Sequence, residues 1–91
     1  MTVKYIPFPA EIRGVVFGMI YGSGNIAIDS SQPEETQQRA LRHELAHLAL
    51  GHQQDTDKPL RAIEAEADAL AAAKTVEQLL NLVERRFKRD S

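Results

Sequence analysis

The 91-residue sequence contains no cysteine, which excludes a group of stabilising and catalytic devices. Disulfides, thiolate zinc fingers, iron–sulfur clusters and thiol nucleophiles all need that side chain. A chain of this length often needs a disulfide or a bound metal to supplement its small hydrophobic core. Any metal must therefore be held by histidine, aspartate or glutamate.

Long apolar runs and a strong excess of either charge are also absent. No stretch approaches the about 18 apolar residues of a membrane-spanning helix, and Pro7 and Pro9 stand where a signal peptide has its apolar run. The formal net charge of −2 argues against nucleic acid as a direct partner. We expect a cytoplasmic protein without a membrane partner, forming one domain over residues 1–91.

The composition changes near residue 30, which predicts an α+β fold. All glycines except Gly51 lie before that point, whereas the second half is rich in helix formers. In the β part, about residues 1–30, residues 14–21 and 25–29 are expected to form a hairpin around the glycine-rich turn at 22–24. Ile6 and Phe8 fit a preceding edge strand or a loop.

Three helices are expected, at about residues 31–52, 59–73 and 75–89. Ser31 followed by Glu34 matches a capping box at the start of the first helix. Pro59 begins the second helix, with Asp57 or Thr56 as its cap.

The third helix has its own start signal, because Thr75 and Gln78 match a second capping box. A single helix bent near Thr75 is the alternative. The apolar positions Leu79, Leu80, Val83 and Phe87 are expected to join the core, with a homo-oligomer seam as the alternative. The predicted architecture is a hairpin or three-stranded sheet packed on the first helix and on one or two further helices.

Residues 43–47 read His-Glu-Leu-Ala-His, the H-E-x-x-H pattern, within the first predicted helix. Residues four apart lie one turn apart on the same helix face, so His43 and His47 can bind one metal ion together. Glu44 lies about 100° round the helix, where it can act as a general base on metal-activated water. Two incidental histidines on a solvated helix face are the structural alternative.

A catalytic zinc needs a third protein ligand and an open fourth position. His52 follows Gly51, which ends the first helix, and is interpreted as a C-terminal cap. Glu64 and Asp68 are better candidates, because they share one face of the second helix. One of them can bind the metal, and the other can accept the ring N–H of a ligand histidine. A solvated acidic face is the alternative.

Residues 36–52 (TQQRALRHELAHLALGH) and 64–71 (EAEADALA) resemble the zincin-type domain of the ImmA/IrrE family. The Glu-x-x-x-Asp spacing is also similar to that of gluzincins. The resemblance implies one zinc per chain, bound by His43, His47 and Glu64. Glu66 is the alternative third ligand, Glu44 is the catalytic base, and Asp68 orients His43.

The resemblance also implies an activity. It predicts a zinc metallopeptidase that hydrolyses a peptide bond in a protein partner, such as a helix-turn-helix repressor of a phage or mobile element. The alternative is a catalytically weak or inactive metal-binding module that sequesters a regulator or toxin. Residues 75–91 are only a short helical tail where the family usually extends further, so we expect little room for a substrate cleft.

Overall fold

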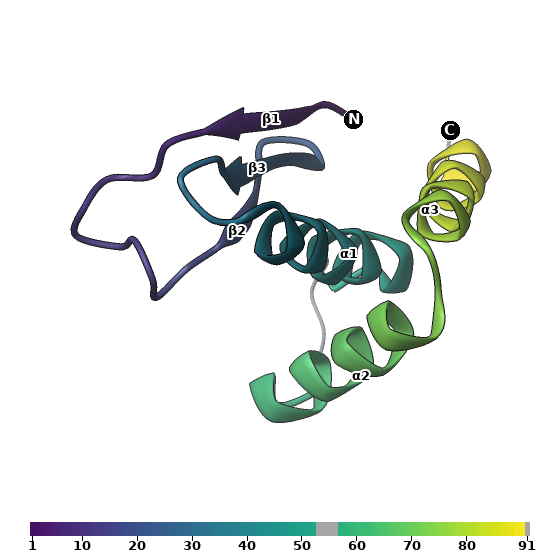
Figure 1. Cartoon of the computed structure of the whole chain (residues 1–91). Helices are drawn as coiled ribbons and strands as arrows, with labels where there is room; N and C mark the ends of the chain where they lie inside the picture. Colours follow the sequence, from purple (N-terminus) through teal and green to yellow (C-terminus); the bar gives the residue numbers. More distant parts are fainter. Residues whose placement is uncertain (53–56, 91) are drawn as a thin grey trace.

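The computed structural model describes residues 1–52 and 57–90. A small mixed sheet lies beside three helices, with α1 in the middle (Figure 1). The elements are β1 (Val3–Ile6), β2 (Gly18–Tyr21), β3 (Asn25–Asp29), α1 (Glu34–Leu50), α2 (Leu60–Ala73) and α3 (Val76–Asp90). The α+β class is confirmed, and of the two expected forms, a hairpin or a three-stranded sheet, the structure has the three-stranded sheet.

The sheet has the strand order β1-β3-β2, so β3 is its central strand. β2 and β3 form the predicted antiparallel hairpin, with Tyr21 opposite Asn25 and Gly18 opposite Ile28. β1 pairs with β3 in parallel, which makes Ile6 the end of an edge strand. Phe8 is buried in the segment that follows. The second edge of the sheet is β2, on the side of the molecule that faces α2.

The first strand of the hairpin is shorter than predicted, because residues 14–17 do not join it. The chain before β2 makes tight turns, in which the backbone N–H of Val16 donates to the carbonyl of Ile12. Gly14 has a positive φ of 87° within these turns. Val15 and Phe17 are consequently exposed instead of lying in a strand.

The prediction that Ser31 caps the first helix is wrong. The N-cap is Pro33, without a side-chain cap hydrogen bond, and α1 begins at Glu34. The Ser31 hydroxyl instead donates to the buried carboxylate of Asp29, at 2.7 Å. Burial acts to raise the pKa of Asp29, but hydrogen bonds from Ser31, Phe8 and Gln32 hold that pKa well below its usual range.

The starts of the other two helices differ in how far they match prediction. α2 begins after Pro59, which is the N-cap and has no side-chain cap hydrogen bond. The prediction of Asp57 as the cap is therefore wrong. The other predicted cap, Thr56, lies outside the described residues. The box at α3 is confirmed, because the Thr75 N–H donates to Gln78 Oε1 at 2.9 Å and the Gln78 N–H donates to Thr75 Oγ1 at 3.2 Å. Lys74 is extended between α2 and α3, so these are two helices and not one bent helix.

The core lies where α1 meets the sheet on one side and α2 and α3 on the other. Its fully buried side chains include Leu45 and Leu48 of α1, Ile26 and Ile28 of β3, and Ala67 of α2. The four apolar positions of α3 pack as predicted: Leu79 and Val83 are buried, and Leu80 and Phe87 pack against the core. Within the described residues, no helix is long and apolar enough to cross a membrane.

Candidate metal centre

The core-facing stripe of α1 fixes the direction of its two motif histidines. Leu41, Leu45 and Leu48 are buried in the core, which turns His43 and His47 toward α2. His43 is half-buried, whereas His47 is only 9% exposed. Their Nε2 atoms lie 3.1 Å apart, as expected for side chains one turn apart on a helix.

α2 brings a carboxylate to the same point. Ala67 is fully buried, and this small side chain allows α2 to lie close to α1. Glu64, one turn earlier, places Oε2 3.1 Å from His43 Nε2 and Oε1 3.2 Å from His47 Nε2. One ligand atom from each of the three side chains lies within 4.8 Å of the others. The structure therefore brings together the two histidines and Glu64.

The three side chains fit zinc in both chemistry and spacing. Two imidazole nitrogens and one carboxylate oxygen are a donor set found in catalytic zinc sites. Zinc bonds of about 2.0–2.1 Å in a tetrahedron place neighbouring ligand atoms about 3.3–3.4 Å apart. The 3.1 Å between the two Nε2 atoms is close to that edge length, and each Nε2 has one of the two Glu64 oxygens at a similar distance of 3.1 or 3.2 Å. Three protein ligands also leave the fourth position that a catalytic zinc requires.

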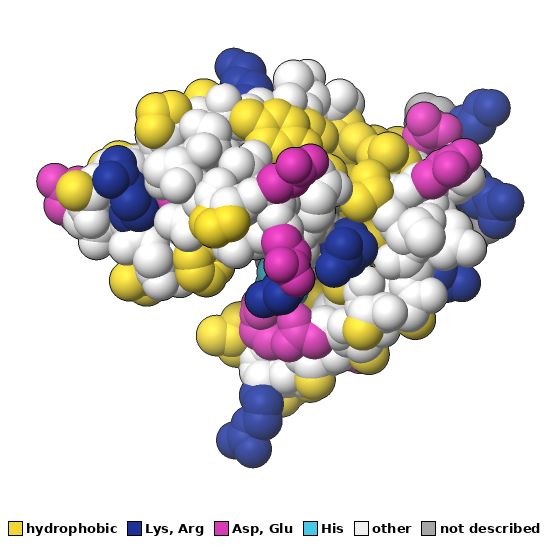
Figure 2. Space-filling model, in the orientation of Figure 1, with side chains coloured by type: hydrophobic (Ala, Val, Ile, Leu, Met, Phe, Trp, Pro, Cys, Tyr) yellow, Lys and Arg dark blue, Asp and Glu magenta, His cyan; other side chains and the backbone are white. Residues whose placement is uncertain are grey.

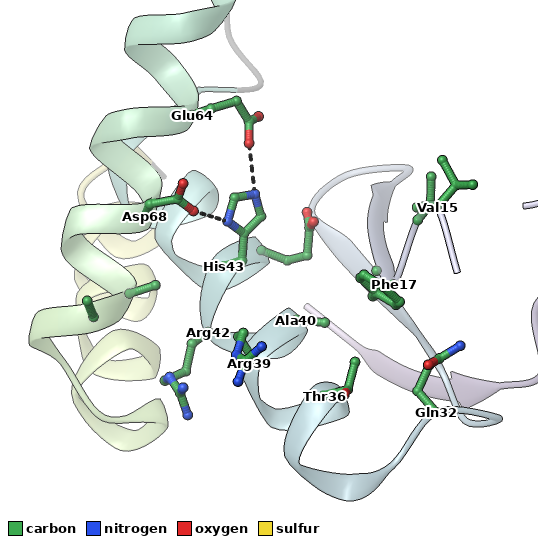
Figure 3. Close-up of a pocket in the computed structure, with 15 residues that line it drawn as sticks. Val15, Phe17, Gln32, Thr36, Arg39, Ala40, Arg42, His43, Glu64 and Asp68 are labelled. Carbon is green, nitrogen blue, oxygen red and sulfur yellow. Dashed lines mark hydrogen bonds and ion pairs between the residues drawn. The ribbon is translucent and has the colours of Figure 1, made fainter. Parts of the chain in front are cut away.

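Asp68 lies one turn beyond Glu64 and contacts the outer side of His43 (Figure 3). Because the carboxylate can only accept, the His43 Nδ1–H donates to Asp68 Oδ1, at 3.0 Å. This hydrogen bond leaves the lone pair of His43 on Nε2, the atom that faces Glu64 and His47. The arrangement is the one that fixes the tautomer of a metal-binding histidine.

Burial shifts the pKa of both His47 and Glu44. Removal from water lowers the pKa of His47 from 6.5, and the neighbouring His43 lowers it further, so the imidazole favours its neutral, metal-binding form. Burial also raises the pKa of Glu44 from 4.5. A raised pKa brings this carboxylate closer to the range useful for a general base.

Gly18 of β2 makes room for Glu44. A Cβ atom at residue 18 would lie 3.3 Å from Glu44 Cγ and 3.0 Å from Ile28 Cδ1, closer than ordinary contacts allow. The glycine therefore lets the edge strand approach the face of α1 that carries the candidate base. The strand pattern of residues 14–21 predicts Gly18 as part of a strand and does not indicate this role.

Glu66, the alternative third ligand, lies apart from the three-residue cluster. Its Oε1 is 2.8 Å from His52 Nε2, and its Oε2 is 2.7 Å from Lys58 Nζ. These two hydrogen bonds lower the pKa of Glu66. The structure thus brings Glu64, and not Glu66, to the two motif histidines.

His52 has a second role that helical periodicity does not predict. Its backbone N–H donates to the carbonyl of His47 at 3.0 Å, in agreement with the predicted helix cap. However, its ring also contacts that of His47, with the two Nδ1 atoms 2.8 Å apart. Continued helical geometry would turn residue 52 about 140° away from residue 47. The chain instead reverses at Gly51, whose φ is 74°.

An open cleft of about 800 Å³ leads to the centre. One side is formed by Val15, Phe17 and Gly18, the other by α2, which includes Glu64, and His43 and Glu44 of α1 line the cleft as well. In Figure 2 a small patch of histidine surface lies in the hollow beside acidic and basic side chains. The expectation of little room for a cleft is therefore wrong, because the turns before β2 supply a wall that was predicted to be strand.

Comparison with known proteins identifies the family. The model of the IrrE N-terminal-like domain, named Peptidase_M78, matches residues 1–79. This match includes α1 and α2, and therefore every side chain of the candidate centre. A search of curated proteins found no significant match, nor did a search of solved structures. The matched span, together with the fold, shows that the chain belongs to the ImmA/IrrE family through an IrrE N-terminal-like, Peptidase_M78 domain.

Proposed function

We propose that the protein is a zinc-dependent peptidase that hydrolyses a peptide bond in a protein partner. The observation that carries this proposal is the meeting of His43, His47 and Glu64 within 4.8 Å, beside Glu44 in an open cleft. Membership of a peptidase family supports it. A structural zinc would need no general base with a raised pKa and no cleft at its side.

Each residue has a separate task in the proposed reaction. Zinc held by His43, His47 and Glu64 would supply Lewis-acid activation of water and of the substrate carbonyl. The Glu44 carboxylate accepts a proton from the attacking water and returns it to the leaving amine nitrogen. Asp68 holds His43 in the tautomer that keeps its Nε2 lone pair directed at Glu64 and His47.

The exposed edge of β2 is suited to hold the substrate backbone. Among the residues that the structure describes, β2 pairs only with β3, and Gly18 at its start lines the cleft. An extended peptide can therefore add to this edge by main-chain hydrogen bonds. Val15 and Phe17, both exposed at the cleft, offer apolar contact to its side chains. A helix-turn-helix repressor encoded beside the gene is the proposed partner, since the family resemblance implies such substrates.

Glu44→Gln tests the proposal, because the amide keeps the shape of the side chain but cannot accept the proton. The zinc-loaded protein is incubated with the neighbouring repressor, and cleavage is followed by mass spectrometry. We expect cleavage to slow at least about 100-fold while one zinc per chain is retained. Glu35→Gln is the matched control, since it lies on the same helix with its side chain 88% exposed.

The same experiment separates hydrolysis from sequestration. If repressor inactivation survives Glu44→Gln without any cleaved product, the protein acts as a metal-binding interaction module. Loss of inactivation together with loss of product supports the peptidase. A wild-type protein that takes up no zinc contradicts both functions.

A further inference from the structure

We infer that His52 and Glu66 position the metal ligand His47, through a hydrogen-bonded chain that runs from carboxylate to imidazole to imidazole. The inference rests on the proposed zinc site but not on its catalytic activity. The distances that carry it are 2.8 Å from Glu66 Oε1 to His52 Nε2 and 2.8 Å from His52 Nδ1 to His47 Nδ1. Of the three residues joined by these hydrogen bonds, Glu66, His52 and His47, His47 alone belongs to the metal cluster.

The turn that ends α1 places His52 where it is needed. Gly51 adopts a left-handed conformation, and the next backbone N–H, that of His52, returns to the carbonyl of His47. This Schellman-type ending folds the chain back over the last helical turn. The His52 ring therefore lies on His47, with its side chain only 6% exposed.

The direction of each hydrogen bond follows from Glu66, the carboxylate at one end of the hydrogen-bonded series. The Glu66 carboxylate accepts only, so the His52 Nε2–H must be the donor to it. A neutral His52 then has its lone pair on Nδ1, and the His47 Nδ1–H must be the donor to that atom. His47 is left with its lone pair on Nε2, which lies 3.2 Å from Glu64 Oε1. That tautomer is the one that can bind the metal.

Lys58 holds Glu66, the carboxylate at the far end of the hydrogen-bonded series. Its Nζ lies 2.7 Å from Glu66 Oε2, so Glu66 has one oxygen for the ammonium group and one for His52. The two ligand histidines are thus oriented by two carboxylates of α2, one directly and one through a second ring. Asp68 contacts His43 without an intermediary, whereas Glu66 reaches His47 only through His52.

His52 is a positioning residue and not a fourth ligand. Both of its ring nitrogens already have partners, Nδ1 on His47 and Nε2 on Glu66. Its Nδ1 meets the Nδ1 of His47, which is the side of that ring opposite to the metal-binding Nε2. His52 would therefore not occupy the fourth position of a zinc held by His43, His47 and Glu64.

Two substitutions at residue 52 separate hydrogen bonding from packing. In His52→Asn, the side-chain oxygen stands near the position of Nδ1 and can still accept from His47. In His52→Leu, the volume is kept but the acceptor is lost. Zinc affinity is measured by titration of the metal-free protein against a competing chelator, and circular dichroism follows folding of each variant.

We expect His52→Leu to weaken zinc binding about 10- to 100-fold, the range for residues that orient metal ligands. His52→Asn is expected to stay within a few-fold of wild type. Equal zinc affinity in wild type and His52→Leu overturns the inference, as does an equal loss in both variants.

A spectroscopic measurement on the wild type supplies a test that needs no variant to fold. Long-range ¹H–¹⁵N spectra of the zinc-loaded, ¹⁵N-histidine-labelled protein should show His52 as the Nε2–H tautomer and His47 as the Nδ1–H tautomer. An Nδ1–H tautomer at His52 overturns the inference, as does a wild type that binds no zinc. Since none of these readouts depends on cleavage, an inactive protein that binds zinc with the expected tautomers refutes only the proposed peptidase.

Discussion

His43 Nδ1 lies 3.0 Å from Asp68 Oδ1, a contact that joins the middle of α1 to the middle of α2 (Figure 3). We predict that Asp68→Ala weakens zinc binding about 10- to 100-fold, because His43 loses the acceptor that fixes its tautomer. Competition with a chelator measures the change. Glu35→Ala is the control, since its pair with Arg39, at 3.8 Å, is exposed and such pairs contribute little. Equal affinity in the two variants would contradict the orienting role.

Glu64 and Glu66 should differ when each is changed to glutamine. Glu64→Gln removes a charged ligand atom from the cluster, so its loss of zinc affinity should exceed the about 10- to 100-fold effect of an orienting residue. Glu66→Gln leaves all three ligands in place, and its effect should stay within that range. The same chelator competition ranks the two variants, and the reverse order would identify Glu66 as the ligand.

The part of the centre that lies on regular helices could be predicted from the sequence. A four-residue spacing fixes His43 and His47 on one face of α1 and Glu64 and Asp68 on one face of α2, whatever the rest of the chain does. The apolar stripe of α1 then decides which face is buried. For the same reason the hairpin and the Thr75 cap were predictable, because their signals are local.

The contacts that depend on loops and on tertiary packing could not be predicted. His52 reaches His47 only because Gly51 reverses the chain, and helical periodicity placed that ring on another face. Ser31 and Glu34 match the capping-box pattern, but the Ser31 hydroxyl donates a hydrogen bond to the buried Asp29 instead of capping α1. The cleft wall at Val15 and Phe17 could not be predicted, because β-branched and aromatic residues favour strands. In the structure Gly14 and the turns around it keep these two residues out of β2.

The pH dependence of zinc binding should follow His47. Since the pKa of His47 in the folded protein lies below 6.5, its neutral form is kept to a lower pH than in an unfolded chain. The stability that this group contributes is full above pH 6.5 and is lost as the pH falls toward the lowered pKa. Zinc affinity and melting temperature, measured between pH 5 and 8, should both fall toward the acid end. A zinc affinity that rises on acidification would contradict the prediction.

Thr75→Ala should lower stability without changing the metal centre. The substitution removes the Thr75 oxygen that accepts from the Gln78 N–H, and loss of an N-cap costs about 0.5–2 kcal/mol. For a domain of this size that is a fall in melting temperature of roughly 4–8 °C per kcal/mol. Thr75→Ser keeps the hydroxyl and should restore most of the loss. An altered zinc affinity in Thr75→Ala would show that α3 is coupled to the centre.

Removal of zinc should lower the melting temperature as well as abolish the proposed activity. The ligands come from α1 and α2, so the metal joins two helices in a chain that has no disulfide. Zinc at 100 times its dissociation constant contributes about 2.7 kcal/mol to the folded state, which corresponds to roughly 11–22 °C at about 4–8 °C per kcal/mol. Thermal melts with and without chelator measure the shift, and His47→Ala, which lacks one ligand, should show little difference between the two conditions. A wild-type melting curve that the chelator leaves unchanged would contradict zinc binding to the folded chain, because a metal that binds the folded and not the unfolded state must stabilise it.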